Sequence, residues 1–351
     1  MSGVVSHSLR TRLQIVSIWL SGALAVVSSG SADDAVWSRF RGENGAGVSA
    51  LKGVPVEWTE SDYEWVRELP GKGHSAPVVW HNKLFVTCGH EDGKRSLLCL
   101  DPATGEEIWS RTITLDANHL HLKNSYASGT PALDGAKVYA AFADEHHYVV
   151  SAYTFDGEEV WTQDLGTFNS QHGQGVSPML AGNLLIVPND QKAPSSIIAL
   201  NKDSGEIAWK TSDRAFRETS YSTPMLIQGP DGRDQLVCIS GATGVTGLDP
   251  TNGSMLWGSG EMPQRTVASP IYGGGVVIAL SGQGGRGKYM VAVEPGAKGR
   301  ESNIRYTHDR DLPYVPTPVV HEGRVYLWLD NGVVSCIDLA SGEVVETQRI
   351  G

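Results

Sequence analysis

One glycine-rich stretch of the sequence has the spacing of a phosphate-binding loop. It reads Gly282-Gln283-Gly284-Gly285-Arg286-Gly287 and so satisfies the pattern G-x-G-x-x-G. In nucleotide-binding proteins this pattern opens a helix whose first turn holds a pyrophosphate. Here the next residues, 288–293, alternate in the manner of a strand. We therefore expect a hairpin loop and no nucleotide site.

Two pairs of histidines could ligate a metal ion. They are His119 with His121, and His146 with His147. Neither pair has a third ligand at a fixed spacing nearby, so we expect loop histidines and no metal site. No G-x-S-x-G nucleophile motif occurs in the chain, and no catalytic residue is predicted.

The four cysteines are too few for a disulfide scaffold. Cys88 and Cys99 flank the loop 89–96 symmetrically, so a cross-strand bridge between them is one alternative. Two buried thiols on neighbouring strands are the other. The remaining two cysteines are Cys238 and Cys336.

These residues are set in a repeated unit, whose clearest copy is residues 175–210. Four short apolar runs, separated by Gly, Asn and Asp, predict four strands of an antiparallel meander. Its last turn closes on a glycine, and a tryptophan follows four residues later. The same offset recurs at Gly105 and Trp109, Gly157 and Trp161, Gly205 and Trp209, Gly253 and Trp257, and, with glutamate as the second residue, Gly342 and Glu346.

A second marker, a small residue followed by proline, leads each unit. Successive markers are 54, 47, 46, 46 and 48 residues apart. A period near 48 with four strands per unit predicts an all-β fold, a β-propeller of four-stranded antiparallel blades. The markers are Ala76-Pro77, Thr130-Pro131, Ser177-Pro178, Thr223-Pro224, Ser269-Pro270 and Thr317-Pro318.

The N-terminus has the pattern of a targeting signal. Arg10 and Arg12 precede about 15 mostly apolar residues, too few to span a bilayer, and small residues follow up to Ala32. We expect residues 1–32 to be a signal peptide cleaved near Ala32, residues 33–64 to be an extension packing on the propeller, and residues 65–351 to be the propeller. The protein is then exported, to the periplasm or cell envelope, with no transmembrane segment in the mature chain.

The charge of the chain argues against nucleic acid as a partner. The sequence has 28 basic and 39 acidic residues, a formal net charge of −11. Removal of residues 1–32 takes away two arginines and no acid, which leaves 26 basic residues and a charge of −13. A polyanion is repelled by such a surface.

The strands predict an incomplete ring. A fourth-strand position occurs seven times, at Trp65, Trp109, Trp161, Trp209, Trp257, Tyr306 and Glu346, but only six sets of the first three strands lie between them. We expect six blades plus one extra strand around Trp65, with that strand and the edge of the sixth blade incompletely paired, and a parent ring of seven or eight blades.

The hairpin ending in tryptophan, the small-Pro marker and second strands such as Lys137-Val138-Tyr139 resemble the repeats of quinoprotein-like β-propellers. That family includes pyrroloquinoline-quinone dehydrogenases and the non-enzymatic outer-membrane assembly propeller of bacteria. The resemblance covers residues 37–351. It implies that Trp65, Trp109, Trp161, Trp209 and Trp257 dock between neighbouring blades, a structural role for a large flat ring.

The resemblance also offers a quinone-dependent dehydrogenase as an alternative. Such enzymes add a central cofactor site with an adjacent-cysteine disulfide, a calcium ion and a catalytic aspartate. No two cysteines are adjacent here, and no acidic residue matches a motif that would carry a calcium ligand across. We therefore expect no cofactor, with pyrroloquinoline quinone and calcium as the alternative.

The connections between blades are long and polar, whereas the turns on the opposite face are mostly two or three residues long. Long loops on a rigid scaffold commonly carry binding residues. Their basic and acidic residues balance, so the sign of a ligand stays open, and so does the alternative that Arg–carboxylate pairs merely pin the loops. The ligand-face candidates are His74, Lys123, Asn124, His172, Arg217, Arg265 and Asp311.

From these features we expect a non-catalytic binding or scaffolding module of the cell envelope. Its partner would be a protein or a small polar ligand bound at the long-loop face. A quinone-dependent dehydrogenase of alcohols or sugars is the alternative function, and a structural component of an envelope assembly is a third.

Overall fold

The computed structural model describes residues 36–118, 120–192, 195–212, 214–284 and 286–350. The predicted signal peptide and His119 lie outside these residues. All the described residues belong to one compact unit, Ser31–Gly351. The described part of this unit holds two short 3₁₀ helices, η2 (Glu43–Gly45) and η3 (Glu60–Asp62), and is otherwise strands and loops. Neither helix has the length and apolar character needed to cross a bilayer.

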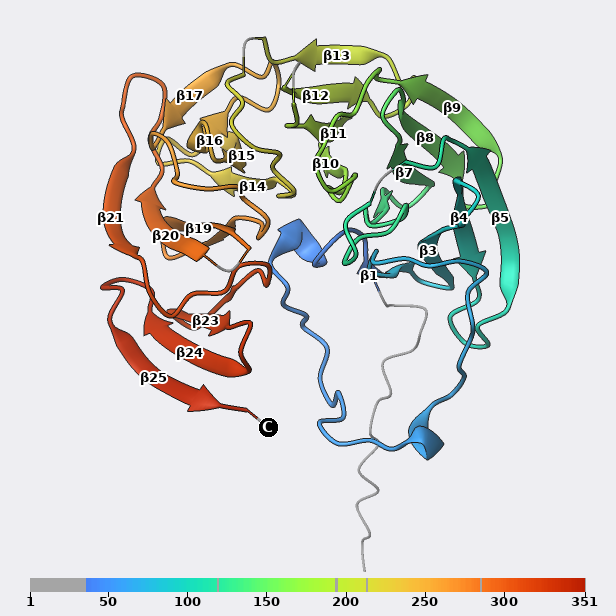
Figure 1. The fold of residues 1–351 in the computed structure, drawn as a ribbon, viewed down its shortest axis with the longest axis horizontal. Helices are drawn as coiled ribbons and strands as arrows, with labels where there is room; N and C mark the ends of the chain where they lie inside the picture. Colours follow the sequence, from blue (N-terminus) through green and yellow to red (C-terminus); the bar gives the residue numbers. More distant parts are fainter. Residues whose placement is uncertain (1–35, 119, 193–194, 213, 285, 351) are drawn as a thin grey trace, which may run out of the picture. The chain divides into compact units, whose positions relative to one another are not determined.

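The strands form six antiparallel sheets, which follow one another in chain order around the centre of the unit (Figure 1). Sheet 1 contains β1 (Val36–Trp37), β2 (Val78–Trp80), β3 (Lys83–Gly89), β4 (Lys94–Leu100) and β5 (Glu107–Thr114). Sheet 2 contains β6 (Ala132–Leu133), β7 (Lys137–Ala143), β8 (Tyr148–Thr154) and β9 (Glu159–Asp164). Sheet 3 contains β10 (Met179–Ala181), β11 (Leu184–Asn189), β12 (Ser196–Asn201) and β13 (Ile207–Lys210).

The second half of the chain repeats this plan. Sheet 4 contains β14 (Met225–Gln228), β15 (Asp234–Ser240), β16 (Gly244–Leu248) and β17 (Met255–Gly258). Sheet 5 contains β18 (Ile271–Gly273), β19 (Val276–Gln283), β20 (Arg286–Glu294) and β21 (Asn303–His308). Sheet 6 contains β22 (Val319–His321), β23 (Arg324–Trp328), β24 (Val333–Asp338) and β25 (Val344–Arg349). Each sheet is a meander, so the β-propeller fold predicted from the repeats is confirmed.

The hydrophobic core lies between the sheets. Alternate side chains of a strand point to opposite faces of its sheet, so each sheet contributes to two clusters. Within β7, Val138 packs against sheet 1, whereas Tyr139 packs against sheet 3. Further clusters join sheets 3 and 4, sheets 4 and 5, and sheets 5 and 6. Each sheet therefore depends on its neighbours for burial.

In five sheets the glycine of the last hairpin receives an aromatic ring from the preceding sheet or, in sheet 1, from Trp65. A Cβ built on Gly157 would lie 2.8 Å from the Trp109 ring, too close for any other residue, and φ is +87° there. The Trp109 indole N–H donates to the carbonyl of Phe155 in the same turn, at 2.9 Å. The same contacts join Trp65 to Gly105, Trp161 to Gly205, Trp209 to Gly253 and Tyr306 to Gly342.

Trp257 is the exception, because sheet 5 lacks the glycine hairpin. Its indole N–H donates to Oε1 of Gln235 in its own sheet, at 2.6 Å. The amide nitrogen of Gln235 then donates to the carbonyl of Gly296 in sheet 5, at 3.0 Å. A buried glutamine thus replaces the direct contact between ring and turn.

The small residues of the proline markers form a row of hydrogen bonds around the centre. The backbone N–H of Ala76 donates to the Thr130 hydroxyl at 3.0 Å, and the N–H of Thr130 donates to the Ser177 hydroxyl at 2.9 Å. The row continues through Thr223 and Ser269 to Thr317. Each hydroxyl satisfies a buried N–H of the preceding sheet, which explains the small hydroxyl residue before most of the prolines.

One expectation about the N-terminal part is wrong. Residues 64–67 form no strand and pair with none of the described strands. Trp65 nevertheless docks on sheet 1, with its N–H donating to Pro102 at 2.9 Å. Within the expected extension, residues 33–64, β1 pairs with β2 and the following residues enter the centre (Figure 1).

Cys88 and Cys99 are not bridged. The register places Cys99 opposite Phe85 and Cys88 opposite Ser96. The two thiols therefore lie on opposite faces of sheet 1, where Cys99 packs towards sheet 2 and Cys88 packs under Leu69. Both are buried thiols on neighbouring strands.

The face of sheet 6 that points away from sheet 5 is open. Tyr326 is 40% exposed and Trp328 is 54% exposed, whereas Tyr139, at the place of Tyr326 in sheet 2, is fully buried under sheet 3. All six residues of β25 are exposed. The blade number of a closed ring stays a prediction.

We predict that Trp109→Ala or Trp209→Ala lowers the free energy of unfolding by about 3–5 kcal/mol, because each empties a large buried aromatic site. Both side chains are only 9% exposed. Chemical denaturation measures the change. The control is Ile108→Ala on the same strand as Trp109, whose side chain is 45% exposed and whose removal should cost about 0.5 kcal/mol or less. Equal midpoints for the tryptophan variants and the unchanged protein would refute the docking role.

Candidate functional site

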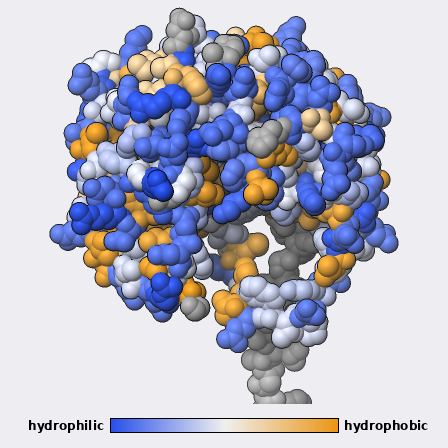
Figure 2. Space-filling model, viewed as in Figure 1, coloured by the Kyte–Doolittle hydropathy of each residue, from blue (hydrophilic) through white to orange (hydrophobic). Residues whose placement is uncertain are grey.

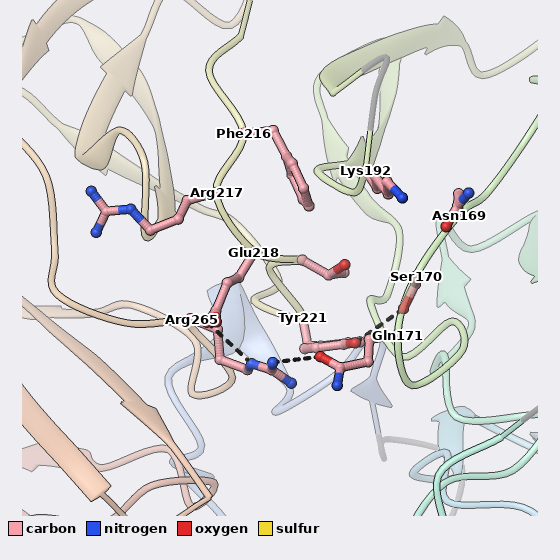
Figure 3. A pocket seen from close by; sticks show the side chains of 10 residues that line it. Asn169, Ser170, Gln171, Lys192, Phe216, Arg217, Glu218, Tyr221 and Arg265 are labelled. Carbon is pink, nitrogen blue, oxygen red and sulfur yellow. Dashed lines mark hydrogen bonds and ion pairs between the residues drawn. The ribbon is translucent and has the colours of Figure 1, made fainter.

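Three consecutive connections between sheets meet at a polar cavity of about 370 Å³ (Figure 3). They join sheets 2 and 3, sheets 3 and 4, and sheets 4 and 5. The loop between β11 and β12 adds one side chain, Lys192. The lining residues are Asn169, Ser170, Gln171, Lys192, Phe216, Arg217, Glu218, Thr219, Tyr221 and Arg265.

Arg265 lies at the base of this cavity. Its side chain is 5% exposed, and its Nε donates to Oε2 of Glu218 at 3.3 Å. Its Nη2 donates to Oε1 of Gln171 at 2.8 Å. Figure 3 shows the guanidinium between these two partners. Arg265 thus ties all three connections together.

The neighbouring arginine has a different orientation. Arg217 extends away from the cavity (Figure 3), where its Nη1 donates to the carbonyl of Met262 at 2.9 Å and its Nη2 pairs with Glu261. Phe216 points towards the space between Lys192 and Glu218. The rim therefore presents an aromatic ring beside an exposed ammonium group.

A buried ion pair fixes the base of the loop that carries these residues. Nε of Arg214 donates to Oδ2 of Asp190 at 2.8 Å, and the two side chains are 5% and 3% exposed. Burial lowers the pKa of Arg214, but the negative charge of Asp190, the interaction with Cys238 and the hydrogen bond to Asp190 together outweigh it and leave this pKa raised. Ser195 donates to the second carboxylate oxygen at 2.6 Å. The Arg–carboxylate pairs therefore pin the loops, one of the two alternatives left open by the sequence.

A row of rings continues the site towards sheet 2. The Tyr221 ring stacks on His172, with centroids 6.2 Å apart, and His172 meets His121 edge to face at 4.8 Å. The Tyr221 hydroxyl lies 3.0 Å from Ser170, and burial raises the pKa of Tyr221. The side-chain amide of Asn124 donates to the carbonyl of His172. The tip of the same loop carries Leu122, which is fully exposed.

The structure brings together some of the predicted ligand-face residues and separates others. Arg217 and Arg265 line the cavity, and His172 and Asn124 lie beside it. Lys123 is exposed on the adjoining loop. His74 lies in the connection before sheet 1, where its N–H donates to Ala127, and Asp311 is exposed in the connection before sheet 6. These last two are outside the cavity lining.

Sequence reasoning missed Gln171, Lys192, Phe216 and Tyr221 as site residues. Three of them occur in connections whose length was recognised, but nothing local distinguishes them from their neighbours. Lys192 comes from a hairpin within sheet 3, and only the three-dimensional arrangement brings it to the same cavity.

The other chemical candidates lie elsewhere. Residues 282–284 and 286–287 belong to the end of β19, the turn after it and the start of β20, and no helix follows them. Gly285 lies outside the described residues. Among the described residues, no group of three His, Cys, Asp or Glu side chains could hold a metal ion. Nδ1 of His121 accepts the N–H of Lys123 at 3.2 Å, and His147 pairs with Asp164 at 2.6 Å. The cavity itself offers hydrogen-bond donors, cations and two aromatic rings, a set that suits binding of a polar group.

Comparisons with known proteins show the family and the fold. A family model described as outer membrane protein assembly factor BamB matches residues 26–152 and 93–348. A curated relative from Yersinia pestis, an outer membrane protein assembly factor BamB, is 26% identical over 260 residues, which cover 70% of this chain and 61% of the relative. The chain thus spans about three fifths of the length of that relative.

Solved structures of two kinds share the fold. BamB from Moraxella catarrhalis has a TM-score of 0.53 at 17% identity, covering 77% of this chain and 71% of that one. The quinohemoprotein alcohol dehydrogenase from Comamonas testosteroni has a TM-score of 0.58 at 15% identity, covering 80% and 59%. A europium-containing methanol dehydrogenase has a TM-score of 0.53 at 14% identity, covering 79% and 68%.

The pair of His147 and Asp164 predicts a pH effect. The hydrogen bond with Asp164 raises the pKa of His147. The pair therefore contributes its full stabilisation of the fold when the pH is below the ordinary histidine pKa. This contribution is lost as the pH rises through the raised pKa of His147. We expect Asp164→Asn to lower the pKa of His147, as followed by NMR titration of its ring protons. Asp156→Asn, at the other end of β8, is the control, and an unchanged His147 titration in Asp164→Asn would contradict the pairing.

Proposed function

Because this chain belongs to the family described as outer membrane protein assembly factor BamB, we propose that it is an exported, non-catalytic propeller that binds a protein partner in the cell envelope. The name of the Yersinia relative describes outer membrane protein assembly, and we carry over to this chain the role of a scaffold in such an assembly. The pattern of residues 1–32 supports export, with cleavage near Ala32.

The observation that carries the proposal is the cavity at the long-loop face. Its loops are held by pairs such as Arg214 with Asp190 and Arg265 with Glu218, so the face is preorganised and little ordering entropy is lost when a partner binds. Phe216 stands at its rim as an apolar anchor. An apolar anchor beside satisfied polar groups is the usual composition of a binding hot spot.

The charges at the cavity favour a partner with a carboxylate. Lys192 and Arg265 bring cations to it, against Glu218 alone among the lining acids, whereas the guanidinium of Arg217 extends away. Arg217 and Arg265 already have acidic partners, whereas the Lys192 ammonium is exposed at the rim. We propose that an acidic side chain of the partner binds at Lys192, with an apolar neighbour against Phe216. The side of the molecule seen in Figure 2 is mostly hydrophilic.

The quinone-dependent dehydrogenase is less well supported. The dehydrogenase structures resemble this chain at 14–15% identity, and that likeness extends to the fold alone. The resemblance implies a central cofactor, but the side chains of Arg39 and Arg41 occupy the centre of this unit.

We predict that Phe216→Ala combined with Lys192→Ala weakens partner binding by about tenfold or more, because the pair removes the ring and the exposed cation from the rim. Binding is measured with the purified full chain and the partner recovered from the envelope of the source bacterium. The same variant should lower the amount of outer-membrane proteins in cells that carry it as their single copy.

The control is Lys210→Ala, an exposed lysine on β13 away from the cavity. It should bind as the unchanged protein does. If the double variant also binds normally and outer-membrane proteins stay at their usual level, the proposed site is in error.

We also predict that the protein does not bind pyrroloquinoline quinone in stoichiometric amounts with calcium. The physical reason is the filled centre, together with the absence of adjacent cysteines from the sequence. Quinone absorbance is measured after reconstitution and gel filtration. Bound quinone at one per chain, with dye reduction on addition of an alcohol or aldose, would favour the enzyme instead.

A further inference from the structure

Residues 36–47, which we call the axial segment, run from sheet 1 into the centre of the unit (Figure 1). Val36 and Trp37 pair with β2, and the carbonyl of Ser38 accepts the N–H of Leu133 in sheet 2. The segment then turns through η2, and the chain leaves the centre as residues 48–64, which are exposed throughout. The axial segment is therefore held by the sheets, whereas the residues that follow it are not.

Three glycines fold the axial segment tightly on itself. Each has a positive φ, and each lies against one large side chain of the same segment. A Cβ on Gly42 would lie 2.4 Å from the Trp37 ring, and one on Gly47 would lie 2.5 Å from the Arg41 guanidinium. Arg41 and Asn44 themselves adopt positive φ, which costs conformational energy in non-glycine residues. Contacts with the surroundings must offset this cost.

Those contacts are made by two arginines and one asparagine. Nη2 of Arg39 donates to the carbonyl of Pro224 at 2.7 Å, and its Nη1 lies 3.5 Å from the sulfur of Met179. Nη2 of Arg41 donates to the carbonyl of Pro318 at 2.6 Å, and its Nη1 donates to Thr317 at 3.2 Å. Asn44 exchanges two hydrogen bonds with the backbone of Leu226. The acceptors belong to sheets 3, 4 and 6 or the turns that lead into them.

The partners that the structure gives to both guanidinium groups are neutral. Arg39 is 7% exposed, and burial lowers its pKa to about 10. A buried cation without a carboxylate is costly, so the carbonyls must be well placed to receive it. A planar guanidinium can serve two carbonyls at once, as Arg41 does, whereas an ammonium group is a point charge without this geometry. The site is therefore matched to arginine in particular.

We propose that the inner carbonyls of Pro224, Thr317 and Pro318 form an arginine-binding site at the centre of the propeller, which the axial segment fills as a tethered ligand. The segment clamps sheets 1 and 2 to sheets 4 and 6 across the centre. It also closes the centre to other ligands. This inference is independent of the partner site at the long-loop face, since it concerns residues that no partner needs to touch.

The test separates the ligand from its tether in the full chain. A recognition sequence for a site-specific protease is inserted after Gly53, where the chain is exposed and a Cβ would meet open space. After folding and cleavage, the fragment carrying residues 36–47 should co-elute with the propeller in size-exclusion chromatography. With Arg39→Ala and Arg41→Ala together, the fragment should separate while circular dichroism shows that the propeller stays folded. Glu43→Gln, an exposed position in the same segment, is the control and should retain the fragment.

A second measurement does not depend on the folding of a variant. A fluorescent synthetic peptide of residues 36–47 is added in excess to the cleaved, unsubstituted protein. It should exchange with the bound fragment, and a peptide with citrulline in place of both arginines should bind at least about tenfold more weakly, because citrulline keeps the shape and loses the charge. Release of the unsubstituted fragment after cleavage, or equal binding of the two peptides, would overturn the proposal.

Discussion

The contact between an aromatic ring and the glycine turn of the next sheet is the constraint on which the rest of the structure depends. None of the six sheets could bury its apolar residues alone, because each relies on neighbouring sheets to cover its faces. Gly157 and its equivalents leave room for the ring at a positive φ, and the indole N–H finds a carbonyl in the same turn. The hydroxyl row at the proline markers performs the same task near the centre. Together they fix the spacing of sheets that share no strand.

The sequence predicts this part of the structure well, because its signals are local. A glycine and a tryptophan four residues apart lie on one hairpin, and the hydroxyl residue before five of the six marker prolines lies two residues before the first strand of its sheet. The axial segment could not be predicted in this way. The partners of Arg39 and Arg41 in the sheets lie 140 to 277 residues away along the chain, and nothing near these two arginines in sequence indicates them. Trp65 docks on sheet 1 as the resemblance implies. A strand at residues 64–67 would also need a neighbouring strand to pair with, and the spacing of the tryptophans does not show whether one is present.

The candidate site was predictable in outline. Long connections marked the face, and Arg217 and Arg265 line its cavity. His74 and Asp311 lie on connections of the same kind, but these connections lead into sheets 1 and 6, and neither residue lines the cavity. Lys192 lies in a hairpin within sheet 3, so only the three-dimensional arrangement of the sheets shows that it lines the cavity. The balance of charge along the loops left the sign of a ligand open, and the pairs that pin Arg214, Arg217 and Arg265 account for much of that balance.

A rigid ring with pinned loops on one face and a filled centre suits a scaffold better than a catalyst. The central claim is that a partner binds at the cavity rim. The most direct measurement places a photo-crosslinking amino acid at Phe216 in living cells and, separately, at Val345 on the exposed β25. We predict a covalent adduct with an envelope protein from position 216 and none with that protein from position 345. An adduct with that protein from position 345 and none from 216 would contradict the claim.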